Sequence, residues 1–100
     1  MILTESDNSC SVTISSGEIV TIRLKENPST GFLWQIEEDG GLVQTGDFRE
    51  AASAIGAEGV RILQFRTEKK GVFQLNLKKL RVWEGDKSII DRFAIKIIVK

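Results

Sequence analysis

Hydrophobic and polar residues alternate along much of this chain, which is the pattern of β-strands with one buried face. Apolar side chains occupy every second position over residues 12–14 and 20–25, separated by Thr, Arg and Lys. The same alternation returns over residues 32–36, 73–78 and 93–99. We predict that the apolar members of these runs form the core: Val12, Ile14, Val20, Ile22, Leu24, Phe32, Trp34, Ile36, Phe73, Leu75, Leu77, Phe93, Ile95, Ile97 and Val99.

The middle of the chain predicts two further strands. Residues 42–48 form a short one, and residues 60–67 form a longer one that begins with apolar side chains on both faces. In the longer run we expect Leu63 and Phe65 to face the core. Residues 49–55 are rich in alanine, and we interpret them as a loop or at most one helical turn. No segment sustains the period of about 3.6 residues that marks an amphipathic helix.

Short strands separated by frequent turns are typical of a β-sandwich or a small barrel. Turn residues interrupt the alternation at Ser16-Gly17, at residues 37–41 and at residues 68–71. About seven strands in a chain of this length favour an immunoglobulin-like antiparallel β-sandwich. The chain has 100 residues, which is enough for a single domain over residues 1–100 with its own core. Trp34, near the start of the third strand, is predicted to be buried.

Composition argues against several classes of partner. Lys plus Arg and Asp plus Glu both number 14, so the formal net charge is zero and no overall field attracts nucleic acid or acidic lipid. No apolar stretch approaches the roughly 18 residues of a membrane span. We therefore expect no nucleic-acid or membrane partner. We also expect a monomer. Residues 1–7 lack the pattern of an export signal, so we expect a cytoplasmic protein, or an exported one if a signal segment was removed.

Composition also argues against catalysis. The chain has no His and no Tyr, which leaves only a serine-lysine or a carboxylate site, and no spacing assembles either. A metal site is disfavoured because the chain has no His, and the acidic turn at residues 37–41 does not have the pattern of a calcium loop. We interpret the single Cys10 as an incidental thiol, since it has neither a disulfide partner nor a base beside it. We predict a protein that is not an enzyme and carries no cofactor.

An unusual loop begins at Asn27 and reads Asn-Pro-Ser-Thr-Gly-Phe-Leu-Trp between two predicted strands. Pro28 fixes its own φ at about −65° and favours an extended Asn27, whereas Gly31 accepts a positive φ. We predict a stiff protrusion. Ser29 and Thr30 at its tip carry hydroxyls that hydrogen-bond either locally or to a partner. The alternative is an ordinary sandwich corner, where Asn-Pro and Gly also occur.

A second loop, Gly56-Ala57-Glu58-Gly59, directly precedes the fifth predicted strand. Its two glycines leave backbone N–H and C=O groups with little cover, which suits main-chain pairing with an extended groove in a partner. A phosphate site is disfavoured because no helix follows and Glu58 repels an anion. A plain flexible turn is the alternative.

A third loop begins at Arg81-Val82-Trp83, where the sixth predicted strand ends. Arg and Trp are the residue types most enriched at binding hot spots, because a planar guanidinium and a large ring bury much area at small entropic cost. The alternative is that Trp83 folds back over the sheet edge with Arg81 stacked on it. Because these three loops connect strands two to three, four to five and six to seven, a sandwich topology places them at one end.

These loops resemble three motifs of the chagasin family, inhibitors of papain-like cysteine peptidases. Asn27-Pro28-Ser29-Thr30-Gly31-Phe32 is similar to the family's Asn-Pro-Thr-Thr-Gly-Phe/Tyr, with Ser in place of the first Thr. Gly56-Ala57-Glu58-Gly59 corresponds to a Gly-x-Gly-Gly-type loop, with Glu58 in place of a Gly. Arg81-Val82-Trp83 corresponds to Arg-Pro-Trp, with Val in place of Pro. The resemblance covers nearly the whole chain.

The resemblance implies an immunoglobulin-like fold and a reversible, non-covalent plug for the active-site cleft of a papain-like cysteine peptidase. It places Ser29 and Thr30 nearest the peptidase's catalytic cysteine and histidine. The glycine-rich loop is expected beside the non-primed subsites, and Arg81 and Trp83 on the primed side. A different class of function stays open from the residues alone: a generic immunoglobulin-like interaction or adhesion module that uses a sheet face or edge.

Overall fold

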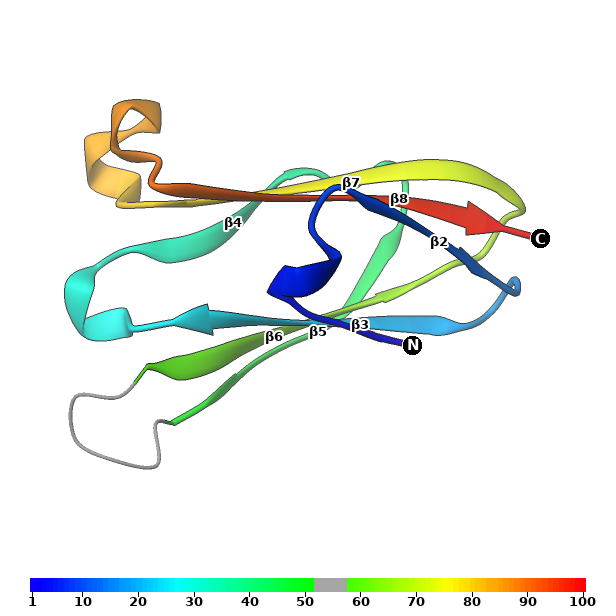
Figure 1. The fold of residues 1–100 in the computed structure, drawn as a ribbon, viewed down its shortest axis with the longest axis horizontal. Coiled ribbons are helices and arrows are strands. Elements are labelled where there is room, and N and C mark those ends of the chain that lie inside the picture. The colour runs from blue at the N-terminus through cyan, green and yellow to red at the C-terminus, as the bar shows by residue number, and fades with distance from the viewer. Residues whose placement is uncertain (52–57) are drawn as a thin grey trace.

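A computed structural model describes residues 1–51 and 58–100 and shows two four-stranded β-sheets packed face to face (Figure 1). The first sheet has the strand order β1 (Ile2–Leu3), β3 (Ile19–Glu26), β6 (Gly59–Arg66), β5 (Val43–Glu50). The second has the order β2 (Cys10–Ile14), β8 (Asp91–Val99), β7 (Gly71–Leu80), β4 (Leu33–Glu38). The 3-10 helices are η1 (Glu5–Asp7), η2 (Pro28–Thr30), η3 (Val82–Glu84) and η4 (Asp86–Ser88).

The core lies between the two sheets and is built from the alternating apolar residues. β3, β6 and β8 bury every second side chain because successive residues of a β-strand point to opposite faces, whereas β5 has no buried residue. Trp34 is 2% exposed, as predicted from its place near the start of a strand. Phe73, Ile36 and Val12 are partly buried against this core. The prediction that Phe32 belongs to the core is wrong, because Phe32 precedes β4 and is half-buried outside it. The fully buried members come from both sheets: Val20, Ile22, Leu24, Leu63 and Phe65 from one, and Leu75, Leu77, Phe93, Ile95 and Ile97 from the other.

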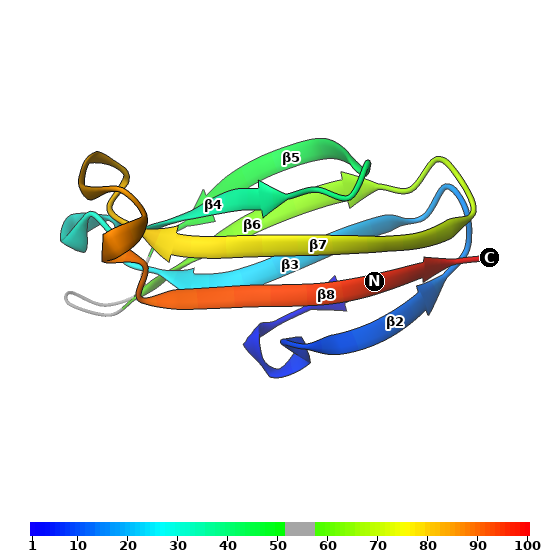
Figure 2. The ribbon, with the colours of Figure 1, turned by 90° about the horizontal axis from the view of Figure 1, so that it is seen from above.

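Two edge strands pair in parallel, so both sheets are mixed and only their other pairs are antiparallel. β1 pairs in parallel with β3, and β2 pairs in parallel with β8. The N-terminal segment crosses from one sheet to the other through η1, which divides it into two strands. β2 then runs to the turn at Ser16-Gly17, at the end of the sandwich where β8 also finishes (Figure 2). β2 and β8 therefore run in the same direction. The predicted immunoglobulin-like β-sandwich is confirmed, with eight strands in the described residues where about seven were predicted, and with two parallel pairs that the sequence did not predict.

β5 is longer than the sequence pattern predicts. Arg49 and Glu50, which were expected to begin a loop, are its last two residues and pair with Arg61 and Val60 of β6. That part of the prediction is wrong because cross-strand hydrogen bonding extends the strand beyond its apolar residues. Ala51 follows the strand as an exposed residue without regular secondary structure, and residues 52–55 of the predicted loop lie outside the described part of the chain.

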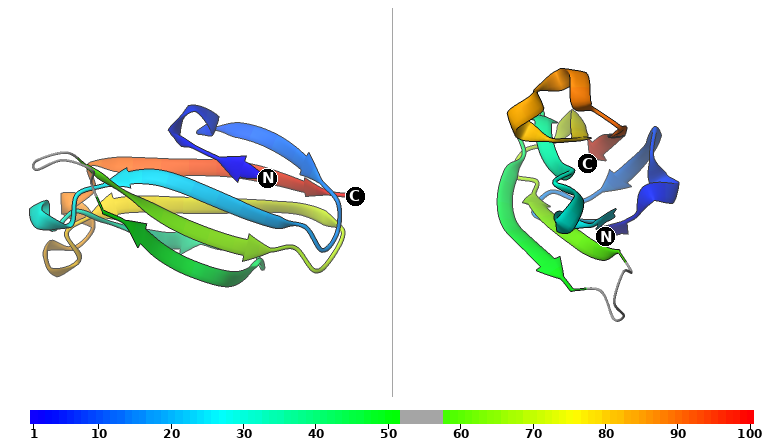
Figure 3. Two further views of the ribbon diagram at one scale, coloured as in Figure 1. Left: turned by 90° about the horizontal axis from the view of Figure 1, so that it is seen from below. Right: turned by 90° about the vertical axis from the view of Figure 1, so that its left-hand side faces the viewer.

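Three connections leave the sheets at the same end of the sandwich (Figures 1 and 3). β3 passes through η2 into β4, β5 ends and β6 begins, and β7 passes through η3 and η4 into β8. The register of the first sheet fixes two of these points next to each other, since Glu26 lies opposite Gly59. The predicted convergence of the three loops at one end is therefore confirmed for the described residues.

Candidate functional site

The first loop is held in shape by its own polar groups. Asn27 Oδ1 accepts hydrogen bonds from the Ser29 backbone N–H at 3.2 Å and from the Ser29 hydroxyl at 2.7 Å. The Thr30 hydroxyl donates to the Asn27 carbonyl at 2.8 Å, and the Phe32 N–H donates to Thr30 Oγ1 at 3.3 Å. Gly31 ends the turn with a φ of +79°. Both tip hydroxyls thus bond locally, which makes the protrusion preordered while Pro28, Ser29 and Thr30 stay exposed.

The third loop presents an exposed apolar surface. Trp83 is 73% exposed and Val82 is 57% exposed, both within the short helix η3. The Arg81 N–H donates to Ser88 Oγ at 3.0 Å, which ties the start of the loop to η4. Solvent exposure of a tryptophan is costly, and such surface commonly marks a protein contact.

The first and third loops brace each other. Arg81 Nε donates to the Thr30 carbonyl at 3.1 Å, and the Arg81 guanidinium lies 4.3 Å from the centre of the Phe32 ring. The Trp83 ring lies so close to Gly31 that a Cβ added there would stand 2.4 Å from Trp83 Cη2. Arg81 therefore stacks on Phe32, and the alternative in which it stacks on Trp83 over the sheet edge is wrong. The two loops form one continuous surface.

The structure describes only Glu58 and Gly59 of the second loop. Gly59 is the first residue of β6, and Glu58 before it is exposed. Gly56 and Ala57, predicted to contact a partner through their backbone, lie outside the described residues. A crevice of about 420 Å³ separates the first loop from the ends of β5 and β6, with Pro28, Ser29, Ala51, Gly59 and Val60 among its lining residues.

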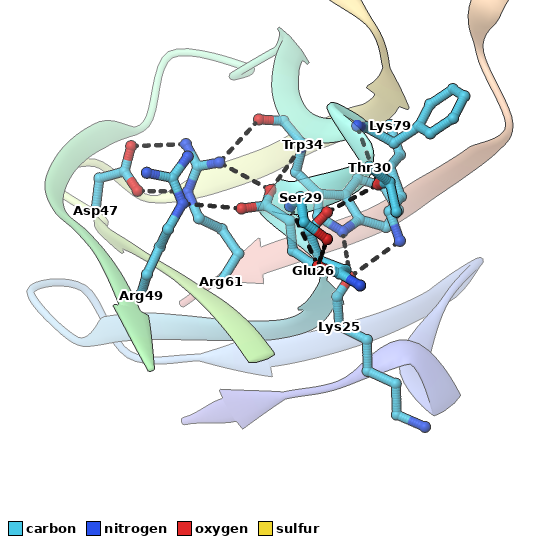
Figure 4. A network of polar contacts seen from close by, with 11 residues as sticks. Lys25, Glu26, Ser29, Thr30, Trp34, Asp47, Arg49, Arg61 and Lys79 are labelled. Atoms are coloured by element: carbon cyan, nitrogen blue, oxygen red, sulfur yellow. Dashed lines mark hydrogen bonds and ion pairs between the residues drawn. The ribbon is translucent and has the colours of Figure 1, made fainter. Parts of the chain in front are cut away.

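A buried ion-pair network lies beneath this end of the sandwich (Figure 4). The Glu26 side chain is 1% exposed, and its carboxylate accepts hydrogen bonds from the Trp34 N–H at 2.8 Å, Arg61 Nη1 at 2.9 Å and Arg49 Nε at 3.0 Å. Arg61 also donates from two nitrogens to the two oxygens of Asp47, at 2.6 and 2.8 Å. Both charges of the Arg61–Asp47 pair and the Glu26 carboxylate are thereby satisfied.

Sequence reasoning missed this network, although the chain carries a signal for it. The alternation of β3 continues from Leu24 to Glu26, and that of β6 runs back from Leu63 to Arg61. Each strand thus places a charged residue in the next inward-facing position at the same end of the sheet. Opposite charges at buried positions of neighbouring strands predict an ion pair.

The network also shifts acid–base equilibria. The hydrogen bond from Arg61 holds the pKa of Asp47 below its ordinary value of 3.8, with burial acting in the opposite direction. The hydrogen bond to Asp47 likewise raises the pKa of Arg61. Both groups are therefore charged at neutral pH, and the pair resists neutralisation.

This end of the sandwich is suited to binding. Within residues 1–51 and 58–100, no group of three or more Cys, Asp or Glu side chains is placed to hold a metal ion. No helix in the same residues is long and apolar enough to cross a membrane. The first and third loops present a fixed backbone shape, backbone hydrogen-bonding groups and the exposed ring of Trp83.

A family model described as chagasin family peptidase inhibitor I42 matches residues 13–97, a range that contains all three loops. The chain belongs to the chagasin family of peptidase inhibitors. Chagasin from Trypanosoma cruzi is 29% identical to it over 101 residues, covering 93% of this chain and 92% of chagasin. Amoebiasin-1 from Entamoeba histolytica is 30% identical over 104 residues and is matched along all of both chains.

Chagasin-family structures share the fold. The crystal structure of the cysteine protease inhibitor EhICP2 from Entamoeba histolytica superimposes with a TM-score of 0.87 at 27% identity, covering 99% of this chain and 93% of that one. Membership of the chagasin family confirms the resemblance inferred from the three loop motifs. It also places the chain among inhibitors and not among enzymes.

Proposed function

We propose that this chain inhibits papain-like cysteine peptidases by inserting the loop end of its sandwich into their active-site cleft, reversibly and without covalent chemistry. The observation that carries the proposal is the bracing of the first loop by the third. Arg81 holds the Thr30 carbonyl and stacks on Phe32, while Trp83 covers Gly31. The two motifs that resemble the family's binding loops thus form one preordered surface.

The first loop enters the cleft. Pro28, Ser29 and Thr30 form η2 at the tip of this loop and are exposed, so they reach a partner first. Cleavage requires a carbonyl aligned at roughly 3 to 3.5 Å from the attacking atom. The internal hydrogen bonds of the loop hold its backbone in a 3-10 turn and oppose that alignment, so the loop blocks the cleft without being cut.

The other two loops contact the cleft on either side of the first. Trp83 offers a large exposed ring on the primed side, with Arg81 beside it in a fixed orientation. Glu58 and Gly59, the described residues of the second loop, contact the non-primed subsites through their backbone. An interface of standard size buries roughly 1,600 Å² in total. Preorganised loops lose little binding free energy to ordering when such an interface forms.

An inhibition titration with a matched pair of variants tests this proposal. The unmodified protein is expected to abolish hydrolysis by a papain-like peptidase at a near-stoichiometric ratio and to leave a serine peptidase active. Ser29→Arg places a bulky side chain at the tip and is expected to weaken inhibition about a hundredfold or more. Ser16→Arg makes the same change in the exposed turn at the opposite end and is expected to inhibit normally.

Full peptidase activity in excess protein refutes the proposal. Equal binding by the unmodified protein and Ser29→Arg would instead assign the contact to a sheet face or edge.

A further inference from the structure

We propose that Glu26 is a positioning residue of the inhibitor: its buried carboxylate fixes the first loop relative to the two strands that carry the second loop. The inference rests on the proposed function for its consequence in inhibition. Its structural part concerns the free protein alone. Because its side chain is 1% exposed, Glu26 offers almost no surface of its own to a peptidase and acts through the groups that it holds.

The carboxylate closes the base of the first loop. Glu26 is the last residue of β3 and directly precedes Asn27, where the loop begins. Its Oε2 accepts the backbone N–H of Trp34, on the strand into which the loop returns, at 2.8 Å. One side chain therefore joins the outgoing and returning ends of the loop. A hydrogen bond from a backbone N–H to a charged acceptor is stronger than a neutral one.

The same carboxylate reaches the strands of the second loop. Arg61 on β6 and Arg49 on β5 are paired in register and both donate to Glu26. One residue beyond that pair, β5 reaches Glu50 and β6 is at Val60, close to where both strands leave the sheet. The crevice of about 420 Å³ lies above this point, and both Glu26 and Arg49 line it. The network thus bridges the base of the crevice between the first loop and the ends of β5 and β6.

Lys25 supplies a second tie on the other side of the loop base. Its carbonyl accepts the indole N–H of Trp34 at 3.0 Å and the ammonium of Lys79 at 3.2 Å, which links β3 to β4 and β7 (Figure 4). The backbone of β3 is therefore anchored to the facing sheet at the position next to Glu26. Glu26 then sets the direction in which the chain enters the loop.

Electrostatics favours a positional role over a purely stabilising one. Removing a carboxylate from water costs free energy that its partners only offset, and an apolar side chain of similar volume often gives equal or greater stability. Hydrogen bonds to three donors at 2.8 to 3.0 Å, in contrast, define direction as well as distance. Asp47 in turn orients Arg61, because both of its carboxylate oxygens accept hydrogen bonds from the guanidinium.

Glu26→Gln tests the inference with little change of shape. The amide keeps one acceptor oxygen and directs an NH2 group towards donors, so at least one of the three bonds is lost. We expect hydrogen exchange of the Thr30, Gly31 and Trp34 amides in the free protein to become at least about tenfold faster. We expect dissociation from papain to become at least about tenfold faster as well.

Two matched variants separate positioning from loss of stability or charge. Asp47→Asn removes the charge of the other carboxylate that pairs with Arg61 but leaves the Glu26 bonds to Trp34 and Arg49, so it is expected to lower the melting temperature without changing loop exchange or dissociation. Glu50→Gln removes an equal charge beside the same crevice and is expected to change none of these readouts. Equal changes in loop exchange and dissociation for Asp47→Asn and Glu26→Gln would overturn the inference.

The outcomes for Glu26 and for the proposed function are distinguishable. Inhibition by the unmodified protein with unchanged loop exchange and dissociation in Glu26→Gln overturns the positioning role alone. Absence of inhibition by the unmodified protein overturns the proposed function, while amide exchange still tests Glu26. If Glu26→Gln does not fold because Arg61 keeps only one of its two carboxylate partners, the double variant Glu26→Gln/Arg61→Gln removes that buried positive charge, and the same readouts and criteria apply.

Discussion

The ring of Trp83 lies directly against the backbone of Gly31, 52 positions earlier in the chain. A Cβ at Gly31 would stand 2.4 Å from Trp83 Cη2, a distance that carbon atoms do not tolerate. The first loop therefore approaches the third as closely as it does only because residue 31 has no side chain. Its φ of +79° is a second reason for glycine at this position.

Gly31→Ala is expected to separate these two loops without unfolding the protein. The exposed Trp83 ring is free to swing away, and the positive φ costs about 1 to 2 kcal/mol in stability. We expect inhibition of a papain-like peptidase to weaken at least about tenfold, since the preordered surface is lost. Inhibition titrations and thermal melts measure the two effects.

Gly17→Ala is the control for Gly31→Ala. Gly17 has a φ of +89° with nothing within 4 Å of an added Cβ, and it lies in the turn at the opposite end. It is expected to lose similar stability and to inhibit normally. Matching losses of inhibition in both variants would mean that strain, and not contact with Trp83, is responsible.

Trp83→Ala is expected to weaken binding without a matching loss of stability. The side chain is 73% exposed in the free protein, so little burial is lost on truncation, whereas a hot-spot tryptophan contributes about 2 kcal/mol or more to binding. Inhibition constants and denaturant unfolding measure the two quantities. Val72→Ala, an exposed residue beside the turn at the opposite end, is the control. An unchanged inhibition constant for Trp83→Ala would remove this residue from the interface.

Val82→Pro is expected to stabilise the third loop. Val82 is the first residue of η3, where proline is favoured, and Arg81 before it is already extended with φ −89° and ψ 111°. A compatible proline gains about 0.4 to 1 kcal/mol by restricting the unfolded chain. Thermal melts and inhibition titrations are expected to show a higher melting temperature and equal or tighter inhibition. Val82→Ala controls for loss of the valine side chain, and a lower melting temperature for Val82→Pro than for Val82→Ala would contradict the prediction.

Acid is expected to weaken the fold partly through Asp47. Its pKa is lowered in the folded state by the hydrogen bond from Arg61, so its contribution is complete above the ordinary value of 3.8 and is lost as the pH falls through the lower, folded value. Urea unfolding measured at several pH values below about 4 is expected to show a shallower decline of stability in Asp47→Asn than in the unmodified protein. Asp39→Asn, in the turn between β4 and β5, is the control. Parallel pH profiles for Asp47→Asn and the unmodified protein would contradict the assignment.

Much of the fold was readable from the chain because β-strands convert a period of two directly into buried and exposed faces. The predicted core positions Ile22, Leu75 and Ile95 are fully buried, as the alternation required. The same rule extended by one step would have placed Glu26 and Arg61 inside. Their charge made them look like surface residues, since charged groups are rarely buried unless they are paired.

Other features depend on contacts that local sequence does not encode. The parallel pairing of β1 with β3 and of β2 with β8 follows from the route of the N-terminal segment between the two sheets. The strand conformation of Arg49 and Glu50 follows from the partner strand β6 and not from their own propensity. Stacking of Arg81 on Phe32 requires two loops to meet from positions 49 residues apart.

The sequence by itself determined the layered β architecture, the identity of the three loop motifs and the membership in an inhibitor family that those motifs indicated. The tertiary structure decided how the motifs are joined. Arg81 and Trp83 of the third loop contact the exposed end of the first loop, and Glu26, held by Arg49 and Arg61, lies at its buried base. The physical reason is the range of the interactions. Alternation and turn chemistry act between neighbours in the chain, whereas hydrogen bonds and ring contacts between distant residues exist only once the sheets have set their register.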